Sequence, residues 1–253
     1  FKVGAVPYVP LVKLKNWKGS GAVGVAETAS ELKQFADLRI PKVSVSLHQQ
    51  PPSRLPVVHS DNEAIGRLAA NHLRELGLSR FAFVGHLAWQ HNVARLKGFR
   101  DELTKHRSDC DVVEVAFQSQ RLSRTRTIEL KRKSLSRQLK TLTYPLGLFA
   151  SHDEFAHDVL ETLREAGLRV PYDAAVVGVN NYRLVCETSD PPLSSIAQSA
   201  HQIGFTAAKL LHEMIQGRKP PKKPVLIPPG GLVARRSSDY SAVSDEVVLQ
   251  AMN

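Results

Sequence analysis

Three polar side chains follow short apolar runs in a way that suits the binding of hydroxyl groups. Arg95 comes soon after such a run, Asp153 follows the run 146–150, and Asn180 directly follows the run 174–179. Guanidinium, carboxylate and carboxamide groups are planar and form paired hydrogen bonds, so each can serve two adjacent hydroxyls. We therefore expect all three to bind a small polar ligand, with Arg95 as the first candidate. A surface arginine and a helix N-cap are the alternative roles of Arg95 and Asp153.

A second group of candidates lies near these three in the sequence. Trp89 is placed to cover the C–H face of a ring-shaped polar ligand, although it could equally pack locally. Gln198 lies where the chain is expected to cross between two lobes, so it could act as a hinge or as a ligand contact. The remaining candidates are His91, Asn181 and His152.

Such residues converge only if the strands before them end at a common edge of a sheet. Short runs rich in β-branched residues alternate here with helical patterns, which is typical of parallel strands joined by crossover helices. Ligands of such sheets bind beyond the carboxyl ends of the strands. The expected strands are 21–25, 42–47, 56–59, 80–85, 111–117, 146–150, 174–179, 193–197 and 225–227.

Helices are expected between most of these strands. In the clearest one, apolar residues recur at helical spacing from Ile65 to Leu76. Ser60 and Asp61 before this helix are possible N-caps, and Gly77 after it suits a left-handed C-cap. The pattern predicts a doubly wound α/β fold. Further helices are expected at 153–167, 203–215 and 244–252.

No catalytic motif accompanies this α/β pattern. The sequence contains neither a GxGxxG after a strand, nor a P-loop, nor a GxSxG nucleophile elbow. Its ten histidines form no HExxH pair or similar set of metal ligands. Asp61, Asp153 and Glu154 could supply acid and base groups, but their spacing fixes no catalytic separation. We expect a binding module without cofactor or metal rather than an enzyme.

Composition favours a soluble domain in a reducing compartment. The 253 residues are 42% hydrophobic and 23% charged, and no apolar run is long enough to cross a membrane. The start of the sequence lacks a secretory pattern, and Cys110 and Cys186 lie far apart, so a cytoplasmic location is expected. A net charge of +10 would attract a polyanion such as DNA. The basic stretch 121–140 contains no aromatic residue among its cations, which favours a solvated helix face.

Several motifs occur in an order that is recognisable as a family pattern. They are Val58–Asn62, Arg95–Phe99, Val170–Asn181, Pro191–Gln198 and Leu232–Ser238. In content and order these motifs resemble the sugar-binding domains of the lactose/galactose-repressor family. The resemblance implies a periplasmic-binding-protein-like type I fold, in which two doubly wound parallel-sheet lobes are joined by crossover strands. It also implies that Arg95 and Asp153 contact ligand, and that Asn180 stands where the family commonly has Asp.

Within that family the sequence resembles regulators of xylose catabolism, on the segments 79–83, 202–212 and 245–252. This resemblance implies D-xylose as the effector, lobe closure on sugar binding, and a homodimer. It also implies control of transcription through a DNA-binding domain of the arabinose-regulator type, which would follow residue 253. A periplasmic sugar-binding protein of a transporter has the same fold and is the alternative, although the segment 245–252 argues against it.

The resemblance also sets the expected boundaries. The family opens with a strand, a helix and a second strand, but Phe1–Trp17 shows no helix of that length. Ligand contacts from that region are therefore expected to be missing from the candidates above. The two-lobed domain is expected at 1–238, with lobe 1 formed by 1–86 and 199–222, lobe 2 by 87–198 and 223–238, and a linker at 239–253.

Overall fold

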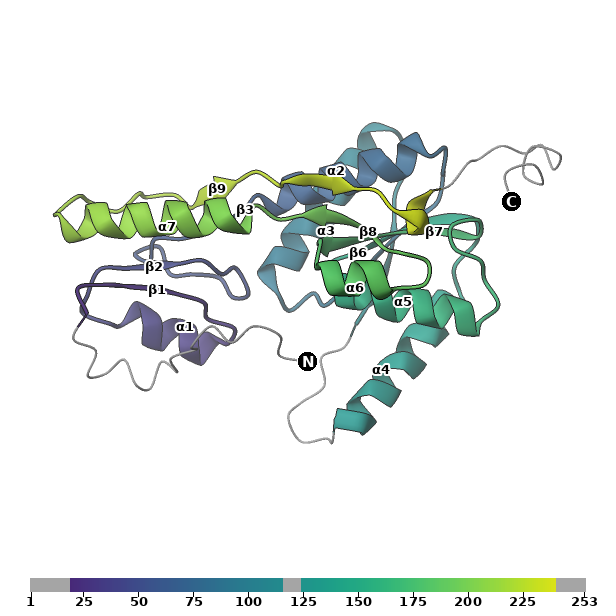
Figure 1. Ribbon diagram of the computed structural model, residues 1–253, viewed down its shortest axis with the longest axis horizontal. Coiled ribbons are helices and arrows are strands. Elements are labelled where there is room, and N and C mark those ends of the chain that lie inside the picture. The colour runs from purple at the N-terminus through teal and green to yellow at the C-terminus, as the bar shows by residue number, and fades with distance from the viewer. Residues whose placement is uncertain (1–18, 116–123, 240–253) are drawn as a thin grey trace. The chain divides into compact units, whose positions relative to one another are not determined.

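The computed structural model describes residues 19–115 and 124–239, which form two compact units (Figure 1). Of these residues, unit 1 comprises 19–60 together with Ser199–Ile227. Unit 2 comprises 61–115, 124–198 and 228–239. The chain therefore passes from one unit to the other three times. The helix expected at 244–252 lies outside the described residues.

Unit 2 is built on a six-stranded sheet with the strand order β10-β8-β7-β6-β4-β5. Every neighbouring pair is parallel except β10 and β8, which are antiparallel. The strands are β4 (Phe81–Gly85), β5 (Asp111–Glu114), β6 (Leu146–Ala150), β7 (Ala174–Asn180), β8 (Ser194–Ala197) and β10 (Gly231–Val233). The helices are α2 (Asn62–Glu75), α3 (Gln90–Lys105), α4 (Arg124–Leu139), α5 (Asp153–Glu165), α6 (Arg183–Thr188) and the 3-10 helix η2 (Arg236–Ser238).

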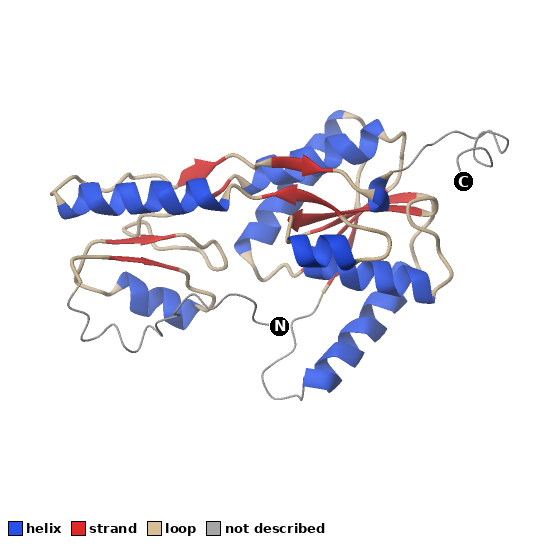
Figure 2. Ribbon diagram, viewed as in Figure 1, coloured by secondary structure: helices blue, strands red, loops and turns tan. Residues whose placement is uncertain are grey.

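Helices cover both faces of this sheet (Figure 2). In β4, Phe81 and Phe83 belong to the apolar cluster that contains residues of α2 and α3. Ala82 and Val84 belong to the cluster that contains residues of α4 and α5. Because successive side chains of a strand point to opposite faces, a sheet that is covered on both sides requires continuous apolar strands. The doubly wound α/β class expected from the sequence is confirmed in this unit.

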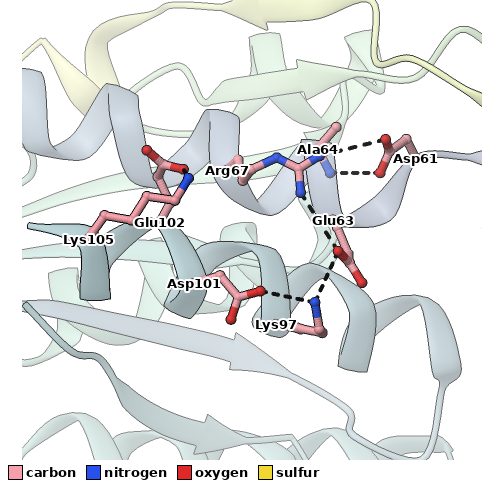
Figure 3. A network of polar contacts seen from close by, with 8 residues as sticks. All are labelled: Asp61, Glu63, Ala64, Arg67, Lys97, Asp101, Glu102 and Lys105. Carbon is pink, nitrogen blue, oxygen red and sulfur yellow. Dashed lines mark hydrogen bonds and ion pairs between the residues drawn. The ribbon is translucent and has the colours of Figure 1, made fainter.

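Helices α2 and α3 cross at a pair of glycines. A Cβ atom at Gly66 would overlap the carbonyl oxygen of Arg95, and one at Gly98 would overlap the carbonyl oxygen of Glu63. Only glycine lets two helix backbones approach this closely. Beside the crossing, Lys97 Nζ lies 3.1 Å from Glu63 Oε2, within a surface network of ion pairs (Figure 3). The crossing fixes the position of α3, which carries Arg95.

Unit 1 contains shorter pieces of parallel sheet. Strand β1 pairs with β2, and β3 pairs with β9, while an isolated bridge joins Ser44 to Val57. A small hydrophobic core contains strand residues together with Ala207 of α7. Thr28 and Glu31 form a capping box at the start of α1. The elements are β1 (Ala22–Gly24), α1 (Ala29–Ala36), β2 (Lys42–Ser44), β3 (Val58–Ser60), α7 (Ala200–Ile215) and β9 (Val225–Ile227).

The boundary between the units differs from the sequence-based expectation at two crossings. Residues 61–86, expected in lobe 1, belong to unit 2, because α2 packs on α3 and β4 lies between β6 and β5 in the large sheet. Residues 223–227, expected in lobe 2, belong to unit 1, because β9 pairs with β3. These two boundaries therefore move from 86 to 60 and from 222 to 227.

Candidate functional site

The sequence-predicted site residues all belong to unit 2 and follow its parallel strands. Trp89, His91 and Arg95 come after β4, and Asp153 comes after β6. Asn180 ends β7, Asn181 follows it, and Gln198 follows β8. Strands β4, β6, β7 and β8 are consecutive neighbours in the sheet, so their carboxyl ends lie along one edge. Open α/β sheets bind their ligands at this edge.

Arg95 is a buried residue and not a surface arginine, since it is only 2% exposed. Its Nε donates to Asn62 Oδ1 at 3.0 Å, and another guanidinium nitrogen donates to the carbonyl oxygen of Ser151. Burial lowers the pKa of Arg95 to about 9, while the nearby Asp153 carboxylate acts in the opposite direction. Arg95 therefore stays positively charged at neutral pH and joins α2, α3 and the loop after β6.

Asp153 is completely buried at the first turn of α5. Ser195 Oγ donates to its Oδ1 at 2.6 Å, and the Tyr182 backbone N–H donates to its Oδ2 at 2.7 Å. Burial raises the pKa of Asp153 to about 6, while these hydrogen bonds act to lower it. The N-cap of α5 is His152, so the alternative role of Asp153 as N-cap does not hold. Asp153 instead ties α5 to β8 and to the loop after β7.

The two asparagines at the end of β7 have unusual backbone angles. Asn180 has a φ of 116° and Asn181 a φ of 49°. Gln198 Nε2 donates to Asn180 Oδ1. The Asn181 backbone N–H donates to Ser195 Oγ at 2.9 Å, and Asn181 Oδ1 accepts from Arg235 at 2.9 Å. Positive φ is uncommon outside glycine, although asparagine tolerates it better than most residues, and such positions occur often at functional sites.

Trp89 lies in a cluster of aromatic rings at the same edge. It stacks on His91 with ring centroids 5.5 Å apart and on Phe155 at 6.3 Å. It also meets His86 and His152 edge to face, at 5.2 Å and 5.6 Å. His91 Nε2 lies 3.2 Å from His152 Nε2, which brings these two candidates together. Local packing of Trp89 is therefore observed, and stacking on a sugar stays a prediction.

Four further residues of the site were missed by sequence reasoning, namely Asn62, Ser151, Ser195 and Arg235. Each donates to, or accepts from, one of the candidates. Asn62 and Arg235 lie inside the motifs that carry the family resemblance, so a signal was present. A single sequence does not show which side chain of a motif reaches the edge of the sheet. Ser195 also lies within a motif, but serine is common in loops and strands alike and gives no hint of its partner.

Residues 19–115 and 124–239 contain no group of three or more His, Cys, Asp or Glu that could hold a metal ion. They also contain no helix that is long and apolar enough to span a membrane. The thiols of Cys110 and Cys186 are buried, and burial raises their pKa to about 11 and about 12, respectively. Both thiols are therefore protonated at neutral pH.

The fold and the site define a class of protein. Doubly wound α/β topology, with polar side chains gathered at the carboxyl edge of the parallel strands, is the arrangement of a small-molecule-binding module. Residues 70–238 match the family described as periplasmic binding protein-like domain, and this chain belongs to that family.

Individual relatives are transcription regulators by name. The chain is 31% identical over 252 residues to the xylose operon regulatory protein of Escherichia coli (strain K12), covering 95% of this chain and 62% of that protein. The protein of the same name from Haemophilus influenzae is 33% identical over 203 residues, covering 78% and 51%. The structure of a xylose-binding transcription activator matches with a TM-score of 0.77 at 30% identity, covering 93% and 62%. The resemblance to xylose regulators seen in the sequence is confirmed, and the chain spans less than two thirds of these relatives.

Proposed function

We propose that this chain is the sugar-sensing part of a bacterial transcription regulator and that D-xylose is its effector. The observation that carries the proposal is the convergence of the candidate residues at the carboxyl ends of four adjacent parallel strands. The similarity to the xylose regulators supports the choice of sugar.

The burial of the candidate residues separates those with a structural role from those that are proposed to contact the sugar. Arg95 and Asp153 are buried and hydrogen-bonded to protein groups, so they are proposed to stabilise the conformation of the carboxyl edge of the sheet. Asn180 and Gln198 are half-buried and are proposed to contact the sugar. A carboxamide carries both donors and acceptors, which matches the mixed hydrogen-bonding capacity of sugar hydroxyls. The half-buried ring of Trp89 is proposed to cover the C–H face of the sugar.

Regulation requires more than binding. A ligand shifts a conformational equilibrium only if it binds one arrangement of the protein more tightly than another. We propose that D-xylose favours one arrangement of the two units, and that a homodimer in the cytoplasm transmits the change to DNA through a further domain. A transporter-linked sugar-binding protein is not favoured, because the relatives described above are regulators of transcription.

Calorimetric titration with D-xylose, L-arabinose, D-ribose, D-glucose and D-galactose tests this function. We expect D-xylose to bind selectively. Gln198→Ala should weaken binding by at least about tenfold, because it removes a polar contact from the site. Lys97→Ala is the matched control, since this side chain is 56% exposed and forms its ion pairs with Asp101 and Glu63 on the surface. It should bind sugar like the unmodified protein.

Three results would contradict the proposal in different ways. Selective binding of another sugar would keep the sensor function and change the effector. Binding of none of the five sugars would reject a sensor of these sugars. Incubation with the same sugars, followed by analysis for products, checks for turnover, and any conversion would contradict the non-enzymatic function.

A further inference from the structure

The segment after β10 is held against the sheet of unit 2 by serine hydroxyls. Ser237 Oγ donates to the carbonyl oxygen of Val176 at 2.7 Å and accepts from the Ser194 backbone N–H at 2.8 Å. Ser194 Oγ in turn donates to the carbonyl oxygen of Arg235 at 2.8 Å and accepts from its N–H at 2.7 Å. Both serines are completely buried. The backbone on both sides of Arg235 is therefore fixed to β7 and β8.

The side chain of Arg235 extends this network to the candidate sugar site. One guanidinium nitrogen donates to Asn181 Oδ1 and another to the carbonyl oxygen of Leu193, each at 2.9 Å. The Asn181 backbone N–H donates to Ser195 Oγ, which donates to Asp153. A continuous series of hydrogen bonds thus runs from the segment before η2 to the buried carboxylate of the site.

The backbone of Asn181 explains why this contact matters. With a φ of 49°, Asn181 lies in the left-handed region, which asparagine tolerates better than most residues and which hydrogen bonds to its side chain and backbone favour further. A guanidinium is a rigid fork of donors, and its hydrogen bonds are strengthened by charge. Arg235 supplies such a bond to the side chain of Asn181, while Ser195 holds its backbone. Asn180, the proposed sugar contact, is the adjacent residue, so its orientation depends on the same restraint.

We propose that Arg235 is a positioning residue for the sugar site and that it couples occupancy of this site to the docking of Arg236–Ser238. The proposal rests on the proposed function, because it takes Asn180 as part of the sugar site. Sugar that orders residues 180 and 181 strengthens the Arg235–Asn181 bond, and this tightens the docked segment. Since coupling between two sites is reciprocal, loosening the docked segment weakens sugar binding by the same factor.

Arginine variants provide the test. Arg235→Ala should bind D-xylose at least about tenfold more weakly in calorimetric titration, because a charge-assisted hydrogen bond is lost. Arg236→Ala is the matched control, since the Arg236 side chain is exposed while the segment is held through the hydroxyl of Ser237, and it should bind like the unmodified protein. Amide hydrogen exchange provides a second readout. D-xylose should slow exchange at Ser194 and Ser237 in the unmodified protein and in Arg236→Ala, but not in Arg235→Ala.

A matched pair of milder variants covers the case in which Arg235→Ala does not fold. Arg235→Lys keeps the positive charge but loses the fork, and Asn181→Gly removes the carboxamide at a φ that glycine accepts readily. If the two groups act through their mutual bond, the losses in affinity from these variants should be clearly less than additive when combined. Additive losses would show that Arg235 does not act through Asn181.

The remaining outcomes separate this inference from the proposed function. Unchanged affinity in Arg235→Ala, or no sugar-dependent protection of Ser194 and Ser237, would overturn the coupling. If the unmodified protein binds no sugar, the proposed function fails. The positioning role is then still decided by exchange without sugar, in which the Asn181 amide should exchange faster in Arg235→Ala than in Arg236→Ala. Equal rates would overturn that role too.

Discussion

Burial is the largest influence on the pKa of both buried charged groups of the site. Arg95, with a pKa lowered to about 9, and Asp153, with a pKa raised to about 6, are both charged at neutral pH. Each is bonded to fixed protein groups, which offsets part of the cost of removing a charge from water. The part of the site around Arg95 and Asp153 is therefore organised before any ligand arrives, so ordering on binding concerns residues 180 and 181.

The pKa of Asp153 predicts a specific pH dependence of stability. Its native value is raised from 3.8 to about 6, so the native protein holds this proton more tightly than the unfolded chain. The corresponding stabilisation is complete below 3.8 and is lost as the pH rises through about 6. Relative to Asp153→Asn, the unmodified protein should therefore gain about 1 kcal/mol when the pH falls from about 7 to about 5.

Urea unfolding of both proteins at the two pH values measures this difference. Asp101→Asn, which changes an exposed carboxylate on α3, controls for the substitution itself. If the unmodified protein gains no stability relative to Asp153→Asn as the pH falls, or loses stability, burial is not the dominant influence on the pKa of Asp153.

The fork of hydrogen bonds at Arg95 predicts that lysine cannot replace it. A lysine ammonium lacks the planar fork with which Arg95 reaches both Asn62 Oδ1 and the Ser151 carbonyl, so Arg95→Lys should reduce the free energy of unfolding by about 2 to 3 kcal/mol. The matched control on the same helix is Arg100→Lys, where the side chain is 44% exposed, and there the change should stay within about 0.5 kcal/mol. Chemical denaturation measures both free energies of unfolding. Equal effects of the two variants would show that the buried hydrogen bonds of Arg95 do not stabilise the protein.

The elements were predictable where apolar patterns are long. The strand expected at 146–150 is β6, and the helix expected after Asp61 is α2. Helix α6 and strand β10 were not expected. Helix α6 has six residues, which carry too little periodicity to be recognised. Strand β10 is as short as β9, but β9 is entirely apolar whereas β10 begins with glycine, so its conformation depends on tertiary contacts. For β10 that contact is its antiparallel pairing with β8.

The site was predictable as far as it depends on where the strands end. The ends of strands could be located, and this was enough to identify Asp153, Asn180 and Gln198 as neighbours of one edge. The bonds made by Ser195 and Arg235 depend on the order of β10, β8 and β7 in the sheet. Strand order is not contained in the local pattern of one sequence.

The glycine crossing of α2 and α3 predicts opposite effects of the same substitution. Gly66→Ala forces the two backbones apart and should reduce stability by about 1 to 3 kcal/mol, although alanine favours helix. Gly204→Ala on α7 meets nothing within 4 Å, so it should stabilise by up to about 1 kcal/mol. Because the contact of Gly66 is the Arg95 backbone, Gly66→Ala should also weaken sugar binding.

Thermal unfolding with calorimetric titration of both alanine variants makes this comparison. The close contact is disproved if Gly66→Ala is as stable as Gly204→Ala. If Gly66→Ala is destabilised but binds sugar with unchanged affinity, the close contact of the two helices contributes to stability and not to the sugar site.

For the whole molecule, the connections between the units restrict how a signal can arise. The chain crosses at 60–61, 198–199 and 227–228, and the second of these crossings begins at the candidate Gln198. If Gln198 holds the ligand, as proposed above, the ligand acts on this connection as well as on the sheet edge. A change at that residue can bias the arrangement of the units without any change inside either core.

Small-angle scattering tests this consequence in solution. Saturating D-xylose should lower the radius of gyration of the chain, because a sugar that regulates must favour one arrangement of the two units, and we propose that the favoured arrangement is the more compact one. A sugar from the same panel that does not bind in calorimetry is the control and should leave the curve unchanged. Gln198→Ala at saturating D-xylose should show a smaller change than Lys97→Ala. If D-xylose binds tightly and the curves with and without it superimpose, regulation by closure is ruled out, and the coupling through Arg235 within unit 2 becomes the route by which occupancy is transmitted.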